Sequence, residues 1–355
     1  MKILITGVGG PTPRSFAICL KKYSIFKDVT LIGTDINPLS IGLYQKELFA
    51  KSYIVPSASS SNYWNSIETI IKENSIDIAI ILPEMEVMEW SKRKETQSLP
   101  CKALLPDYSI ADLLVDKSKM TTILKDLDIV PPSVTFSRDS QNFREVFDLL
   151  KGNFWVRSTS GTSGLGSLKV ADELSLKNWI EINPNVQEFI ASQFLPGRNL
   201  ACKLLYYNGK LMRSACAERV NYIMAKVAPS GITGNTSFGR LLNEPHLVVE
   251  SIRAMDFLFQ HTNANKHGFF TVDFKEDENG KPYITEINVR HVAFTQCFAA
   301  GGANFAADTV HLLSNPETFD ANYKMYEFEK DLIFLRDVDN LPILMKESEL
   351  LQKLS

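Results

Sequence analysis

Strands and helices alternate over the first 82 residues, and this alternation constrains the fold more than any other feature of the sequence. Short apolar runs, typical of buried strands, are separated by segments in which apolar residues recur at helical spacing. The predicted strands cover residues 2–6, 29–34, 52–55 and 76–82, and the predicted helices cover residues 14–22 and 63–74. Such alternation predicts an α/β chain whose N-terminal part is a doubly wound parallel sheet.

The composition is that of a globular protein with two or three domains. Of the 355 residues, 45% are hydrophobic and 22% are charged, which excludes a disordered or fibrous protein. The net charge of −3 leaves no excess of Lys and Arg to neutralise phosphates, so nucleic acid is not expected as the main partner. Apolar runs stay far below the ~18 residues of a membrane span, and Gly7 comes too early for a signal peptide.

Five cysteines bear on the cellular compartment; they stand at positions 19, 101, 202, 216 and 297. Their number is odd and no C-x-x-C pair occurs, which argues against a disulfide framework and against a zinc site. We therefore expect reduced thiols and a cytoplasmic protein.

A glycine-rich turn follows the first predicted strand. Gly7 and Gly9 fit the dinucleotide-binding pattern G-x-G-x-x-G, but the third position is Thr12. Asp35, at the end of the second strand, lies 28 residues after Gly7 rather than the ~20 that the pattern requires. Two interpretations stay open: a dinucleotide site, or a structural turn that starts a helix and lines a cleft. Asp35 is equally well placed for a ligand contact and for a surface position.

Residues 158–167 read STSGTSGLGS and lie between predicted strands 154–157 and 168–170. Backbone N–H groups and hydroxyls in such a loop can surround phosphate oxygens. The segment is neither a P-loop, because no G-K-[ST] occurs, nor a nucleophile elbow, because no G-x-S-x-G occurs. A plain mobile hairpin is the alternative.

Acidic residues gather on a hairpin near the end of the chain. Residues 268–274 and 282–290 read as antiparallel strands joined by a short turn, which lets Asp273 and Glu286 face each other. Glu286 and Asn288 are two residues apart and share one face of the sheet, and Arg290 continues on that face. Three oxygen ligands suit Mg²⁺ or Mn²⁺. The alternative is a solvated strand face with scattered charge.

The order of these segments is more informative than any one of them. A doubly wound domain is followed by Asp116-Lys117, a strand ending in Arg157, the Gly/Ser loop, the segment Gln193-Phe-Leu-Pro-Gly and the strand Glu286-Ile-Asn-Val-Arg290. This order resembles the ATP-grasp superfamily, most of all the ATP-grasp halves of the carbamoyl-phosphate synthase large subunit and related carboxylate–amine ligases. The resemblance covers roughly residues 1–315.

The resemblance implies a role for each matching residue. Implied contacts with ATP are made by Lys117, Arg157, Ser158, Ser160, Gly161, Gly164, Gln193, Phe194, Leu195 and Asn199. Implied metal ligands are Asp273, Glu286 and Asn288. The loop from residue 158 to 166 would be a lid over the triphosphate, residues 193–195 a hinge that reads adenine, and Arg290 the group that stabilises the phosphoryl group in transfer.

Two matching positions depart from the family pattern. Gln193 replaces the usual hinge Glu, and Asn199 replaces the usual ribose-binding Glu. Amides keep the capacity for hydrogen bonds but lose the charge-assisted strength. Arg219 and residues 230–236 lie between the hinge and the metal strands, where they could contact the acceptor or the phosphoryl group, or form a surface loop.

The resemblance also implies a domain organisation. A Rossmann-like pre-ATP-grasp domain would span residues 1–114, a small lid subdomain residues 115–192, and a large subdomain with the metal site residues 193–318. Residues 319–355 would form a C-terminal extension that matches nothing in the family.

The implied activity is that of an ADP-forming ligase that uses ATP and Mg²⁺ (or Mn²⁺) to join a small-molecule carboxylate to an amine through an acyl phosphate. A rival interpretation is a nucleotide-binding regulatory or scaffold protein without turnover, which the two amides favour and the intact acid pair opposes. A single ATP-grasp unit argues against a carbamoyl-phosphate synthase proper, and a dehydrogenase is a more distant alternative. The sequence predicts no oligomeric state.

Overall fold

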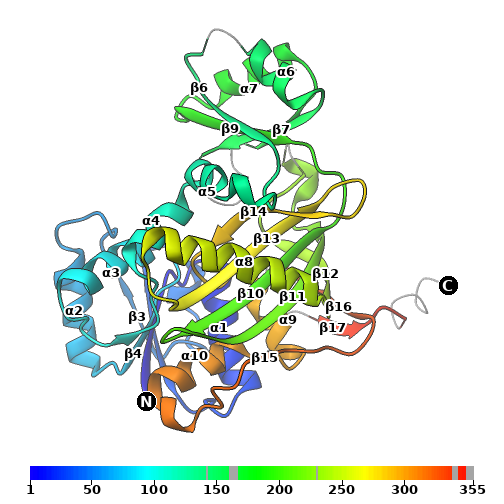
Figure 1. Cartoon of the computed structure of the whole chain (residues 1–355). Helices are drawn as coiled ribbons and strands as arrows, with labels where there is room; N and C mark the ends of the chain where they lie inside the picture. Colours follow the sequence, from blue (N-terminus) through cyan, green and yellow to red (C-terminus); the bar gives the residue numbers. More distant parts are fainter. Residues whose placement is uncertain (141–142, 160–166, 229–230, 338–342, 349–355) are drawn as a thin grey trace.

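A computed structural model describes residues 1–140, 143–159, 167–228, 231–337 and 343–348. Within these ranges the strands form sheets of five, eight and four strands. The four-stranded sheet and its helices form a small domain that stands on a larger body containing the other two sheets (Figure 1). None of the helices in these ranges is long and apolar enough to cross a membrane.

The five-stranded sheet is parallel throughout, in the order β3-β2-β1-β4-β5. Its strands are β1 (Lys2–Thr6), β2 (Thr30–Asp35), β3 (Lys51–Ile54), β4 (Ile78–Ile80) and β5 (Lys102–Ala103). One face packs against α2 (Tyr63–Asn74), α3 (Glu84–Thr96) and α4 (Tyr108–Val115), and the other against α1 (Pro11–Tyr23) and α10 (Phe305–Ser314). The predicted doubly wound sheet is therefore confirmed. Helices α3 and α4 were not predicted. Helix α3 is rich in charged residues and shows little apolar periodicity.

The eight-stranded sheet runs β14-β13-β10-β11-β12-β16-β17, with β15 paired to β11. Its strands are β10 (Asn199–Tyr207), β11 (Lys210–Tyr222), β12 (Thr236–Leu242), β13 (Gly268–Glu276), β14 (Pro282–Asn288), β15 (Lys324–Met325), β16 (Leu332–Leu335) and β17 (Ile343–Lys346). Helix α8 (Pro245–Thr262) covers one face, and α9 (Thr295–Ala300) with α10 covers the other. Asn208 and Gly209 both have positive φ, as a tight β-hairpin requires. The segment predicted as a C-terminal extension contributes strands to this sheet.

The small sheet has the order β6-β9-β7-β8 and a hydrophobic core of its own. Its elements are β6 (Ser133–Ser137), α6 (Arg144–Leu150), β7 (Phe154–Ser158), β8 (Leu168–Val170), α7 (Glu173–Ile182) and β9 (Glu188–Gln193). Helix α5 (Lys117–Leu124) leads into it from the body. Short 3-10 helices cover Ile41–Leu43, Lys125–Leu127, Ala225–Val227 and Pro316–Thr318.

A buried cation lies between the large sheet and helices α9 and α10. Lys203, on β10, is fully buried, and its ammonium donates a hydrogen bond of 2.7 Å to the Thr295 hydroxyl. Aromatic rings surround the ammonium at 4.4 to 6.0 Å from their centroids; they belong to Phe269, Phe294, Phe298 and Phe305. Burial lowers the pKa of Lys203 to about 7. Loss of hydration disfavours the charged form of this ammonium.

This shift predicts how stability changes with pH. Because the pKa of Lys203 is lower in the folded than in the unfolded chain, the unfolded chain binds more protons between about pH 7 and about pH 10. Stability from this group therefore increases as the pH rises through that window. In Lys203→Met, urea unfolding followed by circular dichroism should lose this increase, whereas Lys210→Met, at an exposed position, should keep it. An unchanged pH slope in Lys203→Met would contradict the assignment.

Candidate active site

A cavity of about 700 Å³ lies where residues from all three sheets and their loops meet. Twelve of the residues singled out in the sequence line it: Lys117, Arg157, Ser158, Gln193, Phe194, Leu195, Asn199, Arg219, Asp273, Glu286, Asn288 and Arg290. Three further residues with an implied role in binding ATP, namely Ser160, Gly161 and Gly164, lie outside the described residues. The cavity thus brings together side chains that lie far apart in the sequence, for example Thr12 and Ala293.

Two carboxylates and an amide share one corner of the cavity. Asp273 on β13 lies directly opposite Glu286 on β14, so the predicted register is confirmed. Asn288 Nδ2 donates to Asp273 Oδ2 at 3.2 Å, and Arg219 on β11 forms an ion pair with Asp273 Oδ1 at 2.5 Å. The carboxylate and amide oxygens are donors that suit Mg²⁺. Throughout the described ranges, no group of three or more His, Cys, Asp or Glu residues could hold a metal.

Two cations approach Glu286 from the other side. Lys117 Nζ lies 3.8 Å from Oε1 and Arg157 Nη1 lies 4.0 Å from Oε2. Lys117 is the first residue of α5, whose start is fixed by the Asp116 carboxylate, an acceptor from two backbone N–H groups. Arg157, at the edge of the small domain, also donates to the carbonyl of Thr285 on β14. These contacts tie the small domain to the large sheet across the cavity.

Burial shifts the titration of these groups. It raises the pKa of Asp273 to about 6, although the neighbouring Arg219 acts in the opposite direction. It lowers the pKa of Lys117, which Glu286 opposes. It also raises the pKa of Glu84, at the start of α3, while Arg290 and Lys117 counteract the shift. The charges of the site are therefore held in a poorly hydrated environment, where electrostatic interactions are stronger than in water.

Arg290 does not continue the strand as predicted, because β14 ends at Asn288. The residue lies in the following bend, and its Nη1 donates to the carbonyl of His291 at 3.1 Å. It nevertheless lines the same cavity. The Nε atoms of Arg157, Arg219 and Arg290 are all buried without a hydrogen-bond partner in the part of the chain that the structure describes. Because all three arginines line the cavity, its lining is rich in guanidinium groups and is suited to an anion.

The predicted hinge contributes Gln193, Phe194 and Leu195 to the lining of the cavity. Gln193 ends β9, Asn199 begins β10, and the side chain of Leu195 is buried. The ring of Phe194 is covered by the ammonium of Lys169 at 4.0 Å from its centroid. Trp155, beside this segment, also lines the cavity. An apolar and aromatic wall of this composition is suited to a flat ring system.

The glycine turn lines the cavity, but Asp35 does not. The Asp35 carboxylate accepts hydrogen bonds from Gly9 N at 2.7 Å, Asn37 N at 2.9 Å and Ser40 Oγ at 2.7 Å. It is buried rather than exposed, and it accepts from its own loop and from the neighbouring glycine turn. The expectations of a ribose contact and of a surface acid are both replaced by a structural role. The turn itself starts α1 and lines the cleft, as the second interpretation expected.

Three residues near the site were missed in the sequence. Trp155 stands two positions before Arg157, and the period of two along a strand would have placed it on the same face. Glu84 follows β4 at the carboxyl edge of the parallel sheet, where ligands commonly bind. Tyr222 is the last residue of β11 and lines the cavity. Of residues 230–236, Gly231, Ile232, Gly234 and Asn235 line the cavity, and residue 230 is not described.

Comparisons with known proteins were made on sequence and on structure. No protein-family model matches the sequence, and a search of curated proteins gives no match. Among solved structures, the N5-carboxyaminoimidazole synthetase from Staphylococcus aureus complexed with ADP has a TM-score of 0.70 at 16% identity, over 99% of this chain and 86% of that one. The L-amino acid ligase from Bacillus licheniformis has a TM-score of 0.65 at 14% identity, over 94% and 78%.

A third similar structure is the biotin carboxylase domain of the 2-oxoglutarate carboxylase from Hydrogenobacter thermophilus, in complex with MgADP, ADP and bicarbonate. Its TM-score is 0.67 at 12% identity, over 94% of this chain and 74% of that one. All three neighbours are ATP-grasp enzymes, and at 12% to 16% identity their likeness concerns the fold. The chain therefore has the ATP-grasp fold, as the order of motifs predicted. The particular resemblance to carbamoyl-phosphate synthase stays a prediction.

The role of Asp35 can be tested by its removal. Asp35→Ala leaves three donors without their acceptor, one in the glycine turn and two in the loop after β2, at a cost of about 1–3 kcal/mol in the free energy of unfolding. Urea unfolding measures this cost, and Asp28→Ala, at an exposed position, should stay within about 0.5 kcal/mol of the wild type. Equal stability of Asp35→Ala and wild type would refute the structural role.

Proposed function

We propose that the protein is an ATP-dependent carboxylate–amine ligase that forms an acyl phosphate and releases ADP and phosphate. The observation that carries the proposal is that Arg157, Arg219 and Arg290 line one cavity together with an acid pair, Asp273 and Glu286. Guanidinium groups recognise phosphate oxygens, and the carboxylates of Asp273 and Glu286 suit the divalent cation that accompanies a polyphosphate. The ATP-grasp fold supports the same assignment.

The proposed nucleotide site extends from the hinge to the arginines. The adenine ring would lie between Trp155 and the backbone of residues 193–195, and Asn199 would bind the ribose. Lys117 and Arg157 would bind phosphate oxygens in place of Glu286. The lid would be formed by the loop that starts at Ser158. An ADP complex of a structurally similar synthetase is consistent with a nucleotide in this fold.

Asp273, Glu286 and Asn288 are the proposed ligands of Mg²⁺, and Mn²⁺ would fit the same oxygen donors. When bound, Mg²⁺ supplies charge neutralisation at the β- and γ-phosphates. The chain's own residues orient the reactants. Arg219 is held by Asp273 and Arg290 by the carbonyl of His291, so that both guanidinium groups are pre-positioned for the group in transfer.

The proposed reaction has two steps. A carboxylate oxygen of a small substrate attacks the γ-phosphorus, the bond from this phosphorus to the β–γ bridging oxygen breaks, and ADP forms together with an acyl phosphate. The nitrogen of an amine then attacks the acyl carbon, the bond to the phosphate oxygen breaks, and the nitrogen loses a proton. Exclusion of water from the closed cavity would protect the acyl phosphate between the steps.

The domain division at residues 114, 192 and 318 belongs to this proposal. The separate core of the small domain supports the boundary at residue 192, whereas strands β15 to β17 join the residues after 318 to the large sheet. A cytoplasmic location is also proposed. All five cysteines are free thiols, which is the usual state in a reducing compartment.

Nucleotide binding and its dependence on a metal are the first test. MgATP at ~100 times its Kd should stabilise the wild type by about 2.7 kcal/mol in a thermal-shift assay, and ATP with EDTA should not. Glu286→Gln should lose most of the shift because it removes a metal ligand, whereas Glu278→Gln, at an exposed position of the neighbouring turn, should keep it. The absence of any shift for folded wild type at millimolar MgATP would sink the nucleotide proposal.

The products and Arg290 test the chemistry. With a carboxylate–amine pair found in a coupled screen for ADP release, the products should be ADP and phosphate, never AMP and pyrophosphate. Arg290→Ala should lower kcat on the order of 10²–10³-fold with little change in ATP affinity, because its contact strengthens in the transition state. Arg253→Ala, on an exposed part of α8, is the control.

Other results would redirect the assignment. AMP and pyrophosphate would exclude an acyl phosphate. Weaker ATP binding with unchanged kcat in Arg290→Ala would make Arg290 a ground-state phosphate ligand. Tight MgATP binding by the wild type without ADP release for any pair would favour the regulatory protein that Gln193 and Asn199 suggest.

A further inference from the structure

The hinge segment is fastened to the body at one end. Residues 194–198 connect the small domain, which ends with β9 at Gln193, to the large sheet, where β10 begins at Asn199. Leu195 and Asn199 line the cavity, whereas Arg198 does not. Arg198 therefore stands beside the proposed ribose contact without reaching the ligand itself.

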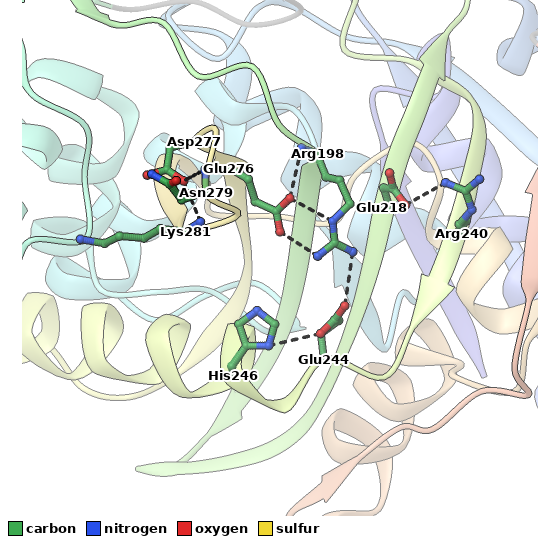
Figure 2. Close-up of polar contacts among 9 residues, drawn as sticks. All are labelled: Arg198, Glu218, Arg240, Glu244, His246, Glu276, Asp277, Asn279 and Lys281. Atoms are coloured by element: carbon green, nitrogen blue, oxygen red, sulfur yellow. Dashed lines mark hydrogen bonds and ion pairs between the residues drawn. The ribbon is translucent and has the colours of Figure 1, made fainter.

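Arg198 is bound to Glu276, the last residue of β13, by three hydrogen bonds. Its Nη2 donates to Oε1 at 2.7 Å, and its Nε and backbone N donate to Oε2 at 2.9 and 3.2 Å. Figure 2 shows this forked pairing of guanidinium and carboxylate. The residue Glu276 is only 4% exposed, so the pair is shielded from water on the acid side. Bidentate pairs of this kind fix orientation as well as distance.

Backbone contacts reinforce this pairing. Gly197 N donates to Glu276 O at 2.9 Å, and Glu276 N donates to Arg198 O at 3.0 Å. The ammonium of Lys275 donates to Gly197 O at 2.6 Å. A Cβ at Gly197 would lie 2.6 Å from the Cβ of Glu276, so only glycine allows the two segments to approach this closely. Residues 197–199 are thus held against the end of β13.

A second carboxylate attaches Arg198 to helix α8. Arg198 Nη1 donates to Glu244 Oε1 at 3.3 Å, and Glu244 Oε2 lies 3.2 Å from His246 Nδ1. Glu244 immediately precedes the helix. The guanidinium therefore lies between the carboxylates of Glu276 and Glu244, which come from two different elements of the body (Figure 2).

We propose that Arg198, with Glu276 and Glu244, positions the body end of the hinge and thereby sets the affinity for the base and ribose of the nucleotide. The inference rests on the proposed function of the cavity. Asn199 follows Arg198 directly and pairs in register with Lys275 on β13. The contacts of Arg198 with Glu276 and Glu244 therefore fix the position of Asn199, the proposed ribose contact. In the part of the chain that the structure describes, the hydrogen bonds and ion pairs of Arg198 go to Glu276 and Glu244, and none joins these residues to Asp273, Glu286 or the arginines of the cavity. They are positioning residues that act on binding and not on phosphoryl transfer.

The experiment compares two ligands of full-length protein by calorimetry. MgATP carries base and ribose, and magnesium tripolyphosphate carries neither. Arg198→Lys keeps the charge but loses the fork. We expect it to weaken MgATP binding about tenfold and to raise the KM for ATP equally, with kcat and the Kd of tripolyphosphate within about twofold of wild type. Arg253→Lys changes an exposed ion pair with Glu250 on α8, away from the hinge, and should change none of these values.

Two further variants keep the test decisive. Glu244→Gln removes only the outer contact and should weaken MgATP binding in the same direction by a smaller factor, even if Arg198→Lys does not fold. Arg198→Lys combined with Glu276→Gln should lose no more affinity than the larger single effect, because both changes break one contact.

Two results would overturn the inference while the proposed function stands: MgATP affinity equal to wild type in both Arg198→Lys and Glu244→Gln, or an equal loss of affinity for MgATP and tripolyphosphate. The latter result would indicate a general structural defect. Failure of the wild type to bind either ligand would instead overturn the proposed function, and the inference with it.

Discussion

The antiparallel pairing of β13 with β14 is the constraint on which the site depends. Its register sets Asp273 opposite Glu286 and leaves Thr285 as the extra residue of a bulge, whose carbonyl accepts from Arg157 of the small domain. The same strand β13 ends at Glu276, to which the hinge is attached. A one-residue slip would turn every side chain to the other face of the sheet, so the acid pair and the domain contact would be lost together.

The ion pairs at the site and at the hinge differ in distance. The pairs of Arg198 with Glu276 and of Arg219 with Asp273 measure 2.7 and 2.5 Å, as charge-assisted hydrogen bonds do. The contacts of Lys117 and Arg157 with Glu286 are longer, at 3.8 and 4.0 Å. The short pairs hold the side chains of Arg198 and Arg219 in fixed positions. At these distances Glu286 attracts the two cations without a charge-assisted hydrogen bond, so an incoming anion can compete with Glu286 for them.

Local patterns predicted what is local in the chain. The turn between residues 276 and 282 is short, so the sequence predicted that Asp273 and Glu286 face each other on neighbouring strands. The parallel sheet was predicted from the alternation of strands and helices. The partner of Arg198 lies 78 residues away and leaves no periodic signal in the sequence. Arg290 was placed on a strand because nothing local marks the end of β14 at Asn288. Asp35 was ambiguous because a structural acceptor and a ligand contact occupy the same position after a parallel strand.

The last strands of the chain have a consequence for the integrity of the body. Strand β16 covers the outer edge of β12, where Gly239 faces Phe334 so closely that a Cβ would lie 2.5 Å from its ring. Phe334 is fully buried and stacks on Phe294, whose ring lies under the guanidinium of Arg219. Loss of β16 would remove this support and leave β12 with unpaired backbone groups, the kind of edge on which other chains add strands. By pairing with β12, residues 332–335 thus disfavour the addition of a strand from another chain at this edge.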